Sequence, residues 1–198
     1  MAKQAKQTAA GKVWLTFDDG PHRAFTDRIL TTLDNAGIGA VFFLVGKNVK
    51  RHGTLPREIV AAGHRVGNHT YTHPRLTELA LPEVERELDR TEALIAELMG
   101  ADKLFRPPFG ARNAAVSRIV RKRGYRTLLW DVSTHDWNKD SQPTAWQAAG
   151  LKGVVRRKEK GSVVLMHDIQ RTTAKHLGAF IASLNELGWV RFGAPAEL

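Results

Sequence analysis

The sequence predicts an α/β protein whose parallel sheet curls into a barrel. Apolar segments that suit strands alternate with amphipathic segments of helical period along the chain. Residues 40–45 and 162–166 are almost continuously apolar, which is typical of parallel strands covered on both faces. Polar residues suited to catalysis follow several of these strands, and they would meet at one edge of a barrel. A closed or nearly closed barrel is therefore favoured, and an open doubly wound sheet is the alternative.

The composition restricts both the domain structure and the chemistry. The chain has 198 residues, of which 42% are hydrophobic, so residues 12–198 are predicted to form a single domain around one core. Residues 1–11 indicate a polar leader without the apolar core of a signal peptide, and no run is long enough to span a membrane. Because cysteine is absent, disulfides, thiol catalysis and thiolate zinc sites are excluded.

The formal net charge is +10, and much of it comes from basic residues clustered in 118–126 and 152–160. Such clusters can favour an anionic surface such as nucleic acid or an acidic wall polymer. We prefer to interpret them as the solvated faces of two helices, because no interleaved aromatic residues or nucleic-acid-binding motif accompany them. We therefore expect no nucleic-acid partner.

The spacing of apolar residues, with glycine and proline at the ends of segments, predicts five helices and seven strands. The predicted helices are residues 27–35, 54–62, 82–99, 113–123 and 173–187. The predicted strands are residues 13–17, 40–45, 64–66, 104–105, 127–130, 162–166 and 190–192. Residues 106–110 contain two prolines and a glycine and are expected to form a stiff, non-helical loop.

The first predicted strand ends in two adjacent carboxylates, Asp18 and Asp19, and Gly20-Pro21 then turns the chain. Neighbouring residues on an extended chain point in opposite directions, so one carboxylate can face a metal while the other faces a substrate. A simple turn without function is the alternative, since Asp-Gly is common in turns.

His69 and His73 stand four residues apart, and on a helical turn both rings would converge on one cation. Thr70 occupies the position where the familiar zinc-protease motif has glutamate, so that motif is excluded. A solvated or buried pair without metal is the alternative. Two histidines and one carboxylate from the first strand are a ligand set that suits a catalytic divalent ion.

Five segments occur in a fixed order along most of the chain: Thr16 to Pro21, Gly67 to Pro74, Arg106 to Gly110, Asp136-Trp137 and Leu165 to His167. Together they resemble the five motifs of the polysaccharide deacetylases of carbohydrate esterase family 4. The resemblance implies a distorted, incomplete β/α barrel with about seven strands. It also implies a metal-dependent hydrolase that removes N-acetyl groups from a chitin oligomer or a peptidoglycan amino sugar. It implies an extracytoplasmic or cell-envelope location, with the cytoplasm as the alternative because the chain shows no signal peptide.

The resemblance assigns roles to residues of this chain. It implies that Asp19, His69 and His73 hold one divalent ion, with zinc favoured over cobalt or another metal. It implies that Asp18 is the general base, kept ionised by the metal and by Arg106.

The remaining roles concern the leaving group and the walls of the groove. His167 ends an apolar strand and is the best candidate for the acid that protonates the leaving amine. The resemblance implies that the backbone N–H of Phe109 stabilises the oxyanion. Trp137 and Leu165 would wall the groove on which a sugar ring packs.

One position departs from the family pattern. Ser133 stands where an aspartate that supports the acid histidine is expected, and Asp131 lies two residues earlier, on the same side of a continuing strand. Asp131 is therefore the predicted stand-in near His167 and the substrate.

Two other functions compete with a deacetylase. An inactive carbohydrate-binding relative would keep the groove, although the complete set of ligands, base and acid argues against it. A metal phosphoesterase would need more carboxylates to hold two ions. The expected partner is an N-acetylated glycan, and the expected oligomeric state is a monomer.

Overall fold

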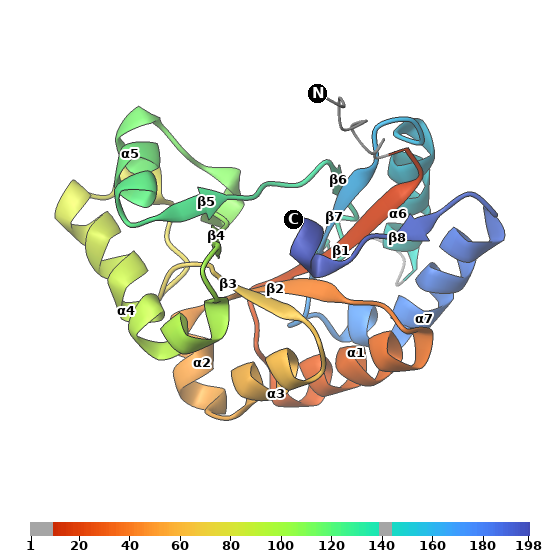
Figure 1. Cartoon of the computed structure of the whole chain (residues 1–198), viewed down its shortest axis with the longest axis horizontal. Helices are drawn as coiled ribbons and strands as arrows, with labels where there is room; N and C mark the ends of the chain where they lie inside the picture. The colour runs from red at the N-terminus through yellow and green to blue at the C-terminus, as the bar shows by residue number, and fades with distance from the viewer. Residues whose placement is uncertain (1–9, 139–143) are drawn as a thin grey trace, which may run out of the picture.

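The computed structural model of the chain describes residues 10–138 and 144–198 and contains one curved parallel sheet (Figure 1). Nine residues of the predicted leader, 1–9, lie outside the described part. Seven strands follow one another in the order β5-β4-β3-β2-β1-β7-β6, and β8 pairs with the start of β1. The strands are β1 Lys12–Asp18, β2 Ala40–Leu44, β3 Arg65–Asn68, β4 Lys103–Phe105, β5 Tyr125–Thr127, β6 Val132–Ser133, β7 Ser162–His167 and β8 Arg191–Phe192.

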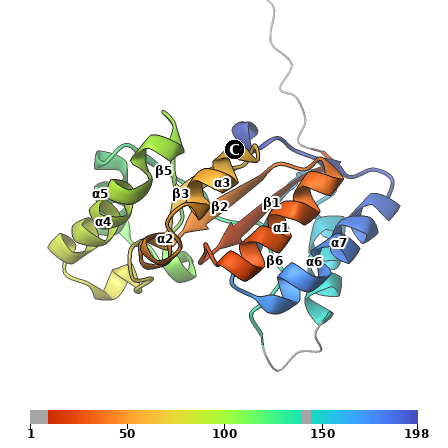
Figure 2. The same ribbon diagram turned by 90° about the horizontal axis from the view of Figure 1, so that it is seen from below.

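Helices wrap the outside of this sheet, as the two views at right angles show (Figures 1 and 2). They are α1 Arg23–Ala36, α2 Gly46–His52, α3 Leu55–Ala61, α4 Leu81–Met99, α5 Ala114–Lys122, α6 Ala145–Arg156 and α7 Arg171–Glu186. Three short 3₁₀ turns complete the described elements: η1 Leu76–Glu78, η2 Pro108–Gly110 and η3 Pro195–Glu197. No helix in the described ranges is long and apolar enough to cross a membrane.

The sheet curls into a half-barrel that stays open between β5 and β6. Residues 128–131 join these two strands, and the described residues show no pairing of β5 with β6. The prediction of an incomplete barrel with about seven parallel strands is therefore confirmed, and the open doubly wound alternative is wrong. Because all strands run parallel, their carboxyl ends lie at one edge of the half-barrel.

The two faces of the central strands pack against different layers. In β2, Phe42 and Leu44 belong to the large core beneath the helices, whereas Val41 and Phe43 form a smaller cluster with Leu104. All residues of β2 are buried, as predicted for a strand covered on both faces. The strand register places Asp18 and His167 side by side at the carboxyl edge, because β1 pairs Asp18 with Phe43 of β2 on one side and with His167 of β7 on the other.

The structure corrects several predicted elements. The predicted strand 127–130 is wrong: β5 ends at Thr127, and a separate strand, β6, begins at Val132. Helix α2 was not predicted, because its only buried residues are Gly46 and Val49, which give no apolar stripe. Helix α6 likewise lies outside the predicted ranges, and it ends before Lys158 and Lys160.

Residues 106–110 also differ in part from the non-helical loop expected there. Pro108–Gly110 forms the 3₁₀ turn η2, but Phe109 within it has a left-handed φ of 59°. The segment is therefore a tight turn rather than a regular helix.

Replacing Gly67 by alanine should destabilise the sheet next to the histidine loop. A Cβ atom at Gly67 would lie 2.8 Å from the Phe43 ring and 3.0 Å from the Leu104 carbonyl oxygen. We expect the free energy of unfolding to fall by about 1–3 kcal/mol, the cost of overpacking. Gly178→Ala is the matched control, because the nearest atom to its Cβ would be 3.7 Å away; stability should stay the same or rise by about 0.5–1 kcal/mol. Denaturant unfolding of both variants checks this, and equal stabilities would contradict it.

Candidate metal centre and catalytic cavity

A cavity of about 500 Å³ opens at the carboxyl edge of the half-barrel. Loops that follow β1, β3, β4, β5 and β6, together with residues of β1, β6 and β7 themselves, contribute its lining, so segments far apart in sequence meet there. The lining residues are Asp18, Asp19, His69, His73, Phe109, Trp130, Ser133, His135, Trp137, Leu165 and His167. The cavity thus contains every predicted site residue except Arg106, which lies beneath it, and Asp131, which lies elsewhere.

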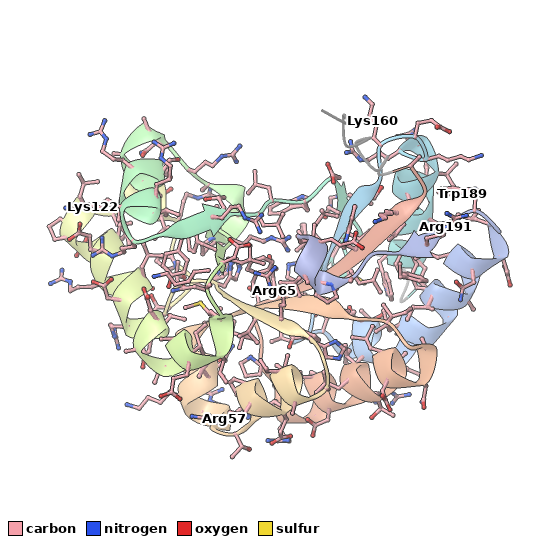
Figure 3. All side chains as sticks on the ribbon, viewed as in Figure 1. Arg57, Arg65, Lys122, Lys160, Trp189 and Arg191 are labelled. Carbon is pink, nitrogen blue, oxygen red and sulfur yellow. The ribbon has the colours of Figure 1, made fainter. Side chains whose placement is uncertain are left out.

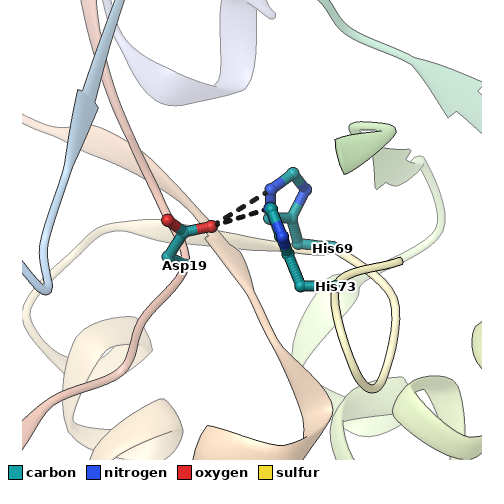
Figure 4. Close-up of side chains that lie close together, drawn as sticks. All are labelled: Asp19, His69 and His73. Atoms are coloured by element: carbon teal, nitrogen blue, oxygen red, sulfur yellow. Dashed lines mark ion pairs between the residues drawn. The ribbon is translucent and has the colours of Figure 1, made fainter. Parts of the chain in front are cut away.

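Asp19, His69 and His73 converge in this cavity (Figure 4). Asp19 Oδ1 lies 3.5 Å from His69 Nε2 and 3.1 Å from His73 Nε2. Each residue offers one ligand atom, and these atoms all lie within 4.8 Å of one another. Figure 4 shows the carboxylate facing both imidazole rings from the opposite side.

The two histidines reach this position from a loop and not from a helical turn. His69 directly follows β3, and Thr70 and His73 both have left-handed φ angles, of 66° and 64°. Glu87 of α4 fixes the loop, because its carboxylate accepts hydrogen bonds from the backbone N–H groups of Tyr71 and Thr72 at 2.8 and 2.7 Å. The two rings therefore converge without the helical turn that the spacing argument considered.

A hydrogen bond orients the buried ring of His69. Its Nδ1–H donates to the backbone carbonyl of Arg106 at 2.6 Å, which leaves Nε2 as the nitrogen that faces Asp19. Metal-binding histidines are usually held in this way by a carbonyl or carboxylate behind the ring.

The backbone conformation at Asp19 is itself fixed by neighbouring residues, and this sets the position of the carboxylate. Asp19 has a φ of 77°, and its carbonyl accepts a hydrogen bond from the Asn48 side chain at 2.7 Å. The next residue, Gly20, packs directly against the buried carboxylate of Asp168, where a Cβ atom would have no room. Asp168 in turn accepts a hydrogen bond from the Thr26 hydroxyl at 2.6 Å, so β7 and α1 together brace the turn that carries Asp19.

These three side chains fit a divalent ion. Asp19 Oδ1 is a buried acceptor that makes no hydrogen bond within the described residues, so it is available as a ligand. Burial alone would raise the pKa of Asp19, but His69 and His73 outweigh burial and hold that pKa well below its usual range. Two imidazole nitrogens and one carboxylate oxygen, facing an open cavity, are the donor set of catalytic zinc sites.

Asp18 occupies a different environment from its neighbour. Its Oδ1 accepts a hydrogen bond from Arg106 Nη1 at 2.8 Å, while Oδ2 lies 3.7 Å from His69 Nε2. Arg106 is fully buried and also donates to the Thr16 hydroxyl at 2.8 Å and to the carbonyls of Leu128 and Leu129. The fixed, buried guanidinium is therefore the counter-charge that holds the Asp18 carboxylate in place.

His167 enters the cavity from the end of β7 and is held by Asp136. The Nδ1 atom lies 2.7 Å from Asp136 Oδ1, and the backbone N–H of His167 donates to Asp136 Oδ2 at 2.8 Å. Burial lowers the pKa of His167, but the Asp136 carboxylate, with smaller contributions from Asp18 and Asp19, raises it to about 9. Because Asp136 engages Nδ1, Nε2 is the nitrogen left to exchange a proton with a bound molecule.

The predicted role of Asp131 beside His167 is wrong. Asp131 precedes β6 and therefore lies toward the amino end of the sheet, where its carboxylate binds Arg157 at 2.6 Å and the backbone N–H of Val163 at 2.9 Å. The carboxylate that supports His167 is Asp136, so Ser133 leaves no gap in the support of the acid. Asp136 was already part of the Asp136-Trp137 motif. Asp131 was chosen instead because the predicted strand 127–130 was assumed to continue past residue 130.

Aromatic side chains form the walls of the cavity. Phe109 is exposed, and its ring meets the edge of His73 with centroids 4.8 Å apart. Trp137 is also exposed, whereas Leu165 is buried at the floor. Sequence reasoning missed Trp130 and His135 as lining residues; the only signal for them was their position close to the Asp-Trp pair.

Fold and site together define the class of protein: an incomplete, parallel α/β barrel whose carboxyl edge carries two histidines and one aspartate that could hold a metal ion. The sequence profile of the polysaccharide deacetylases matches residues 5–128. The chain belongs to the polysaccharide deacetylase family.

Individual relatives agree with this assignment. The chain is 33% identical over 181 residues to the peptidoglycan-N-acetylglucosamine deacetylase PgdA of Listeria monocytogenes; the match covers 90% of this chain and 37% of that protein. It is similar in structure to a family 4 carbohydrate esterase from Streptomyces lividans in complex with acetate, with a TM-score of 0.78, 36% identity and coverage of 90% of both chains. A family 4 pseudoenzyme from Bacillus anthracis, BA3943, gives a TM-score of 0.81 at 32% identity, covering 96% of this chain and 65% of that one.

The chain spans about a third of the length of the first of these relatives. The family also contains a pseudoenzyme with the same fold, so fold alone does not decide activity. Whether such a fold is active therefore depends on the residues in its cavity.

Proposed function

We propose that this protein is a metal-dependent hydrolase that removes N-acetyl groups from an N-acetylated polysaccharide and releases acetate. The observation that carries the proposal is the meeting of three groups in one cavity: the Asp19, His69 and His73 cluster, the Asp18–Arg106 pair and the His167–Asp136 pair. Hydrolysis of an amide needs an activated water molecule, stabilisation of the oxyanion and protonation of the leaving amine. The three groups supply candidates for these tasks.

Asp19, His69 and His73 would hold one divalent ion, for which zinc is our proposal. When bound, such an ion polarises the amide carbonyl and makes water more acidic. Asp18 then accepts a proton from the attacking water, with Arg106 keeping the carboxylate ionised before the reaction. The backbone N–H of Phe109 is the proposed further donor to the oxyanion.

His167 completes the reaction as the general acid. Its Nε2 proton passes to the nitrogen of the amide as the C–N bond breaks, which releases a free amine and acetate. The Asp136 carboxylate holds the ring in place and favours the protonated form, so the acid is available at neutral pH. Trp137 and Leu165 would contact the sugar ring along the wall of the groove.

The two alternative functions receive less support. An inactive carbohydrate-binding relative would not need the base with its arginine, the acid with its aspartate and a full ligand set. A two-metal phosphoesterase would need further carboxylates, and within the described residues only one group of three or more possible metal ligands is found.

The substrate class and location follow from the same proposal. Chitin oligomers and peptidoglycan amino sugars are the proposed N-acetylated substrates, and the cell envelope is the proposed place of action. Residues 12–198 would form a single catalytic domain, acting as a monomer.

Acetate release from a panel of chitin oligomers, peptidoglycan fragments and acetylxylan tests the proposal. We expect acetate from at least one of the two N-acetylated glycans when divalent metal is supplied. Phosphate release from a generic ester is the comparison for a phosphoesterase. Absence of acetate from every glycan, with metal bound and the protein folded, would contradict the proposal and favour an inactive relative.

Replacing Asp136 by asparagine should shift the alkaline limb of the pH–rate profile to lower pH. The pKa of His167 is raised to about 9 against burial chiefly by the Asp136 carboxylate, so the acid form is present below that pH and is lost above it. Without the negative charge the pKa of His167 falls, and we expect the limb to move down by about one unit or more.

The control is Asp131→Asn, which removes a carboxylate that contacts Arg157 and not His167, and it should leave the limb in place. Turnover at saturating glycan is measured across pH for the parent and both variants, with metal content determined in each. If the alkaline limb does not move in the Asp136 variant, His167 is not the acid that titrates there.

A further inference from the structure

A second hollow of about 380 Å³ lies against the edge strand β6 and helix α6. Two of its lining residues, Ser133 and His135, also line the catalytic cavity, so the two hollows adjoin at these residues. The other lining residues are Asp131, Val132, Ala149, Lys152, Gly153, Arg156 and Arg157. None of these has a role in the proposed reaction.

Helix α6 can approach β6 closely because it carries glycine at the contact. At Gly153 a Cβ atom would clash with the Val132 side chain, and at Gly150 it would lie 2.9 Å from the Phe180 ring and 3.0 Å from Thr134. The helix is thereby fixed on the strand edge. Lys152 and Arg156, which stand one turn apart on the same helix, consequently flank the hollow.

The charges in this hollow are unbalanced. Asp131 is neutralised by Arg157 at 2.6 Å, whereas no acidic side chain in the described residues lies within ion-pair distance of Lys152 or Arg156. Both of these side chains are exposed. Two like charges one turn apart repel each other slightly, and an anion bound between them would relieve this repulsion.

We propose that Lys152 and Arg156 form an anion subsite for the carboxylate groups of an acidic N-acetylated glycan, next to the catalytic cavity. This inference rests on the proposed function and narrows its substrate class. A glycan chain in the catalytic cavity would pass Ser133 and His135, and a carboxylate attached to a neighbouring sugar would then reach the hollow. Glycans of the peptidoglycan type carry such carboxylates, and chitin oligomers carry none.

The test compares a double variant, Lys152→Ala with Arg156→Ala, with the parent on three substrates of similar length. These are a neutral chitin oligomer, a peptidoglycan strand whose only carboxylates are the lactyl groups, and the same strand with its stem peptides. We expect the ratio of kcat/KM for acidic over neutral glycan to fall about fivefold to tenfold, mainly through KM, as for the loss of two partly exposed charge contacts.

The acidic strand whose kcat/KM falls in the double variant identifies the source of the carboxylate. The stem peptide is joined through the lactyl carboxyl group, so the strand with peptides has no free lactyl carboxylate. A fall only for the strand without peptides therefore assigns the subsite to the lactyl group, and a fall only for the strand with peptides assigns it to the stem peptide. A fall for both shows that the subsite binds either carboxylate. The parent's preference for the acidic strand should also weaken at high salt, since exposed charges are screened.

A matched control is available on the other side of the molecule. Arg121 and Lys122 are also one arginine and one lysine on a single helix, in the last turn of α5, and Lys122 lies at the far end of the molecule from α6 (Figure 3). The variant Arg121→Ala with Lys122→Ala should keep the parent's substrate ratio. The charge-conserving variant Lys152→Arg with Arg156→Lys should also keep most of it.

The outcomes separate this inference from the proposed function. If acetate is released but the double variant keeps the parent's ratio, or the α5 control loses as much, the subsite is overturned while the deacetylase proposal stands. If no substrate gives acetate, equilibrium binding decides: tighter binding of the acidic strand by the parent than by the double variant supports the subsite alone. Equal binding by the two proteins overturns it.

Discussion

Replacing Asp18 by asparagine should leave the metal bound and lower turnover by about two to four decades, the range for loss of a general base. Asparagine keeps the shape of the side chain and an oxygen that can accept the hydrogen bond from Arg106, which is 2.8 Å away in the parent. It cannot accept a proton from water. Because Asp18 is not among the three clustered ligand residues, metal content should be close to that of the parent.

The same change also affects stability, since it leaves the fully buried Arg106 without its counter-charge. We expect a loss of roughly 3 kcal/mol, typical for breaking a buried ion pair, so turnover must be measured where the variant is folded. Asp34→Asn on the exposed face of α1 is the control and should change neither property. A folded, metal-loaded Asp18 variant with near-parental turnover would show that Asp18 is not the base.

The second large effect is expected from His73→Ala, which should weaken metal binding and thereby abolish turnover at limiting metal. The His73 ring is partly exposed and its Nε2 faces Asp19, so its loss removes a ligand with little damage to the core. Loss of an outer hydrogen-bond partner of a metal site costs about 10–100-fold in affinity, and loss of a ligand should cost more. Metal affinity measured by competition with a chelator checks this.

The control for this variant is His176→Ala, because His176 lies on α7, away from the metal cluster. His69→Ala should weaken binding as well, but its ring is buried and bonded to the Arg106 carbonyl, so some stability is lost too. An unchanged metal affinity in the His73 variant would contradict the ligand set.

Much of the fold could be predicted because its strands are short apolar runs bounded by turn residues. The wholly buried β2 is the clearest case, since a run of five apolar residues is typical of a parallel strand covered on both faces. Helix α2 could not be predicted in the same way. It lies at the surface with two buried residues, and only tertiary contacts make it a helix.

Most residues of the candidate site could be predicted from the sequence, whereas the local backbone geometry that holds them could not. The spacing of His69 and His73 suggested a helical turn, but the loop is set by Glu87, which is distant in sequence, and by two left-handed residues. Likewise, the choice of Asp131 over Asp136 depended on where β5 ends. That boundary is fixed by pairing with β4, which the local pattern does not contain.

The most direct test of the central claim is acetate release by the metal-free protein during titration with a divalent ion. The protein is first stripped with a chelator, its metal content is measured, and zinc or cobalt is then added in known steps with an N-acetylated glycan present. We predict that release is absent at the start, rises in proportion to bound metal and reaches its maximum at one ion per chain. Full turnover by protein shown to contain no metal would contradict the account.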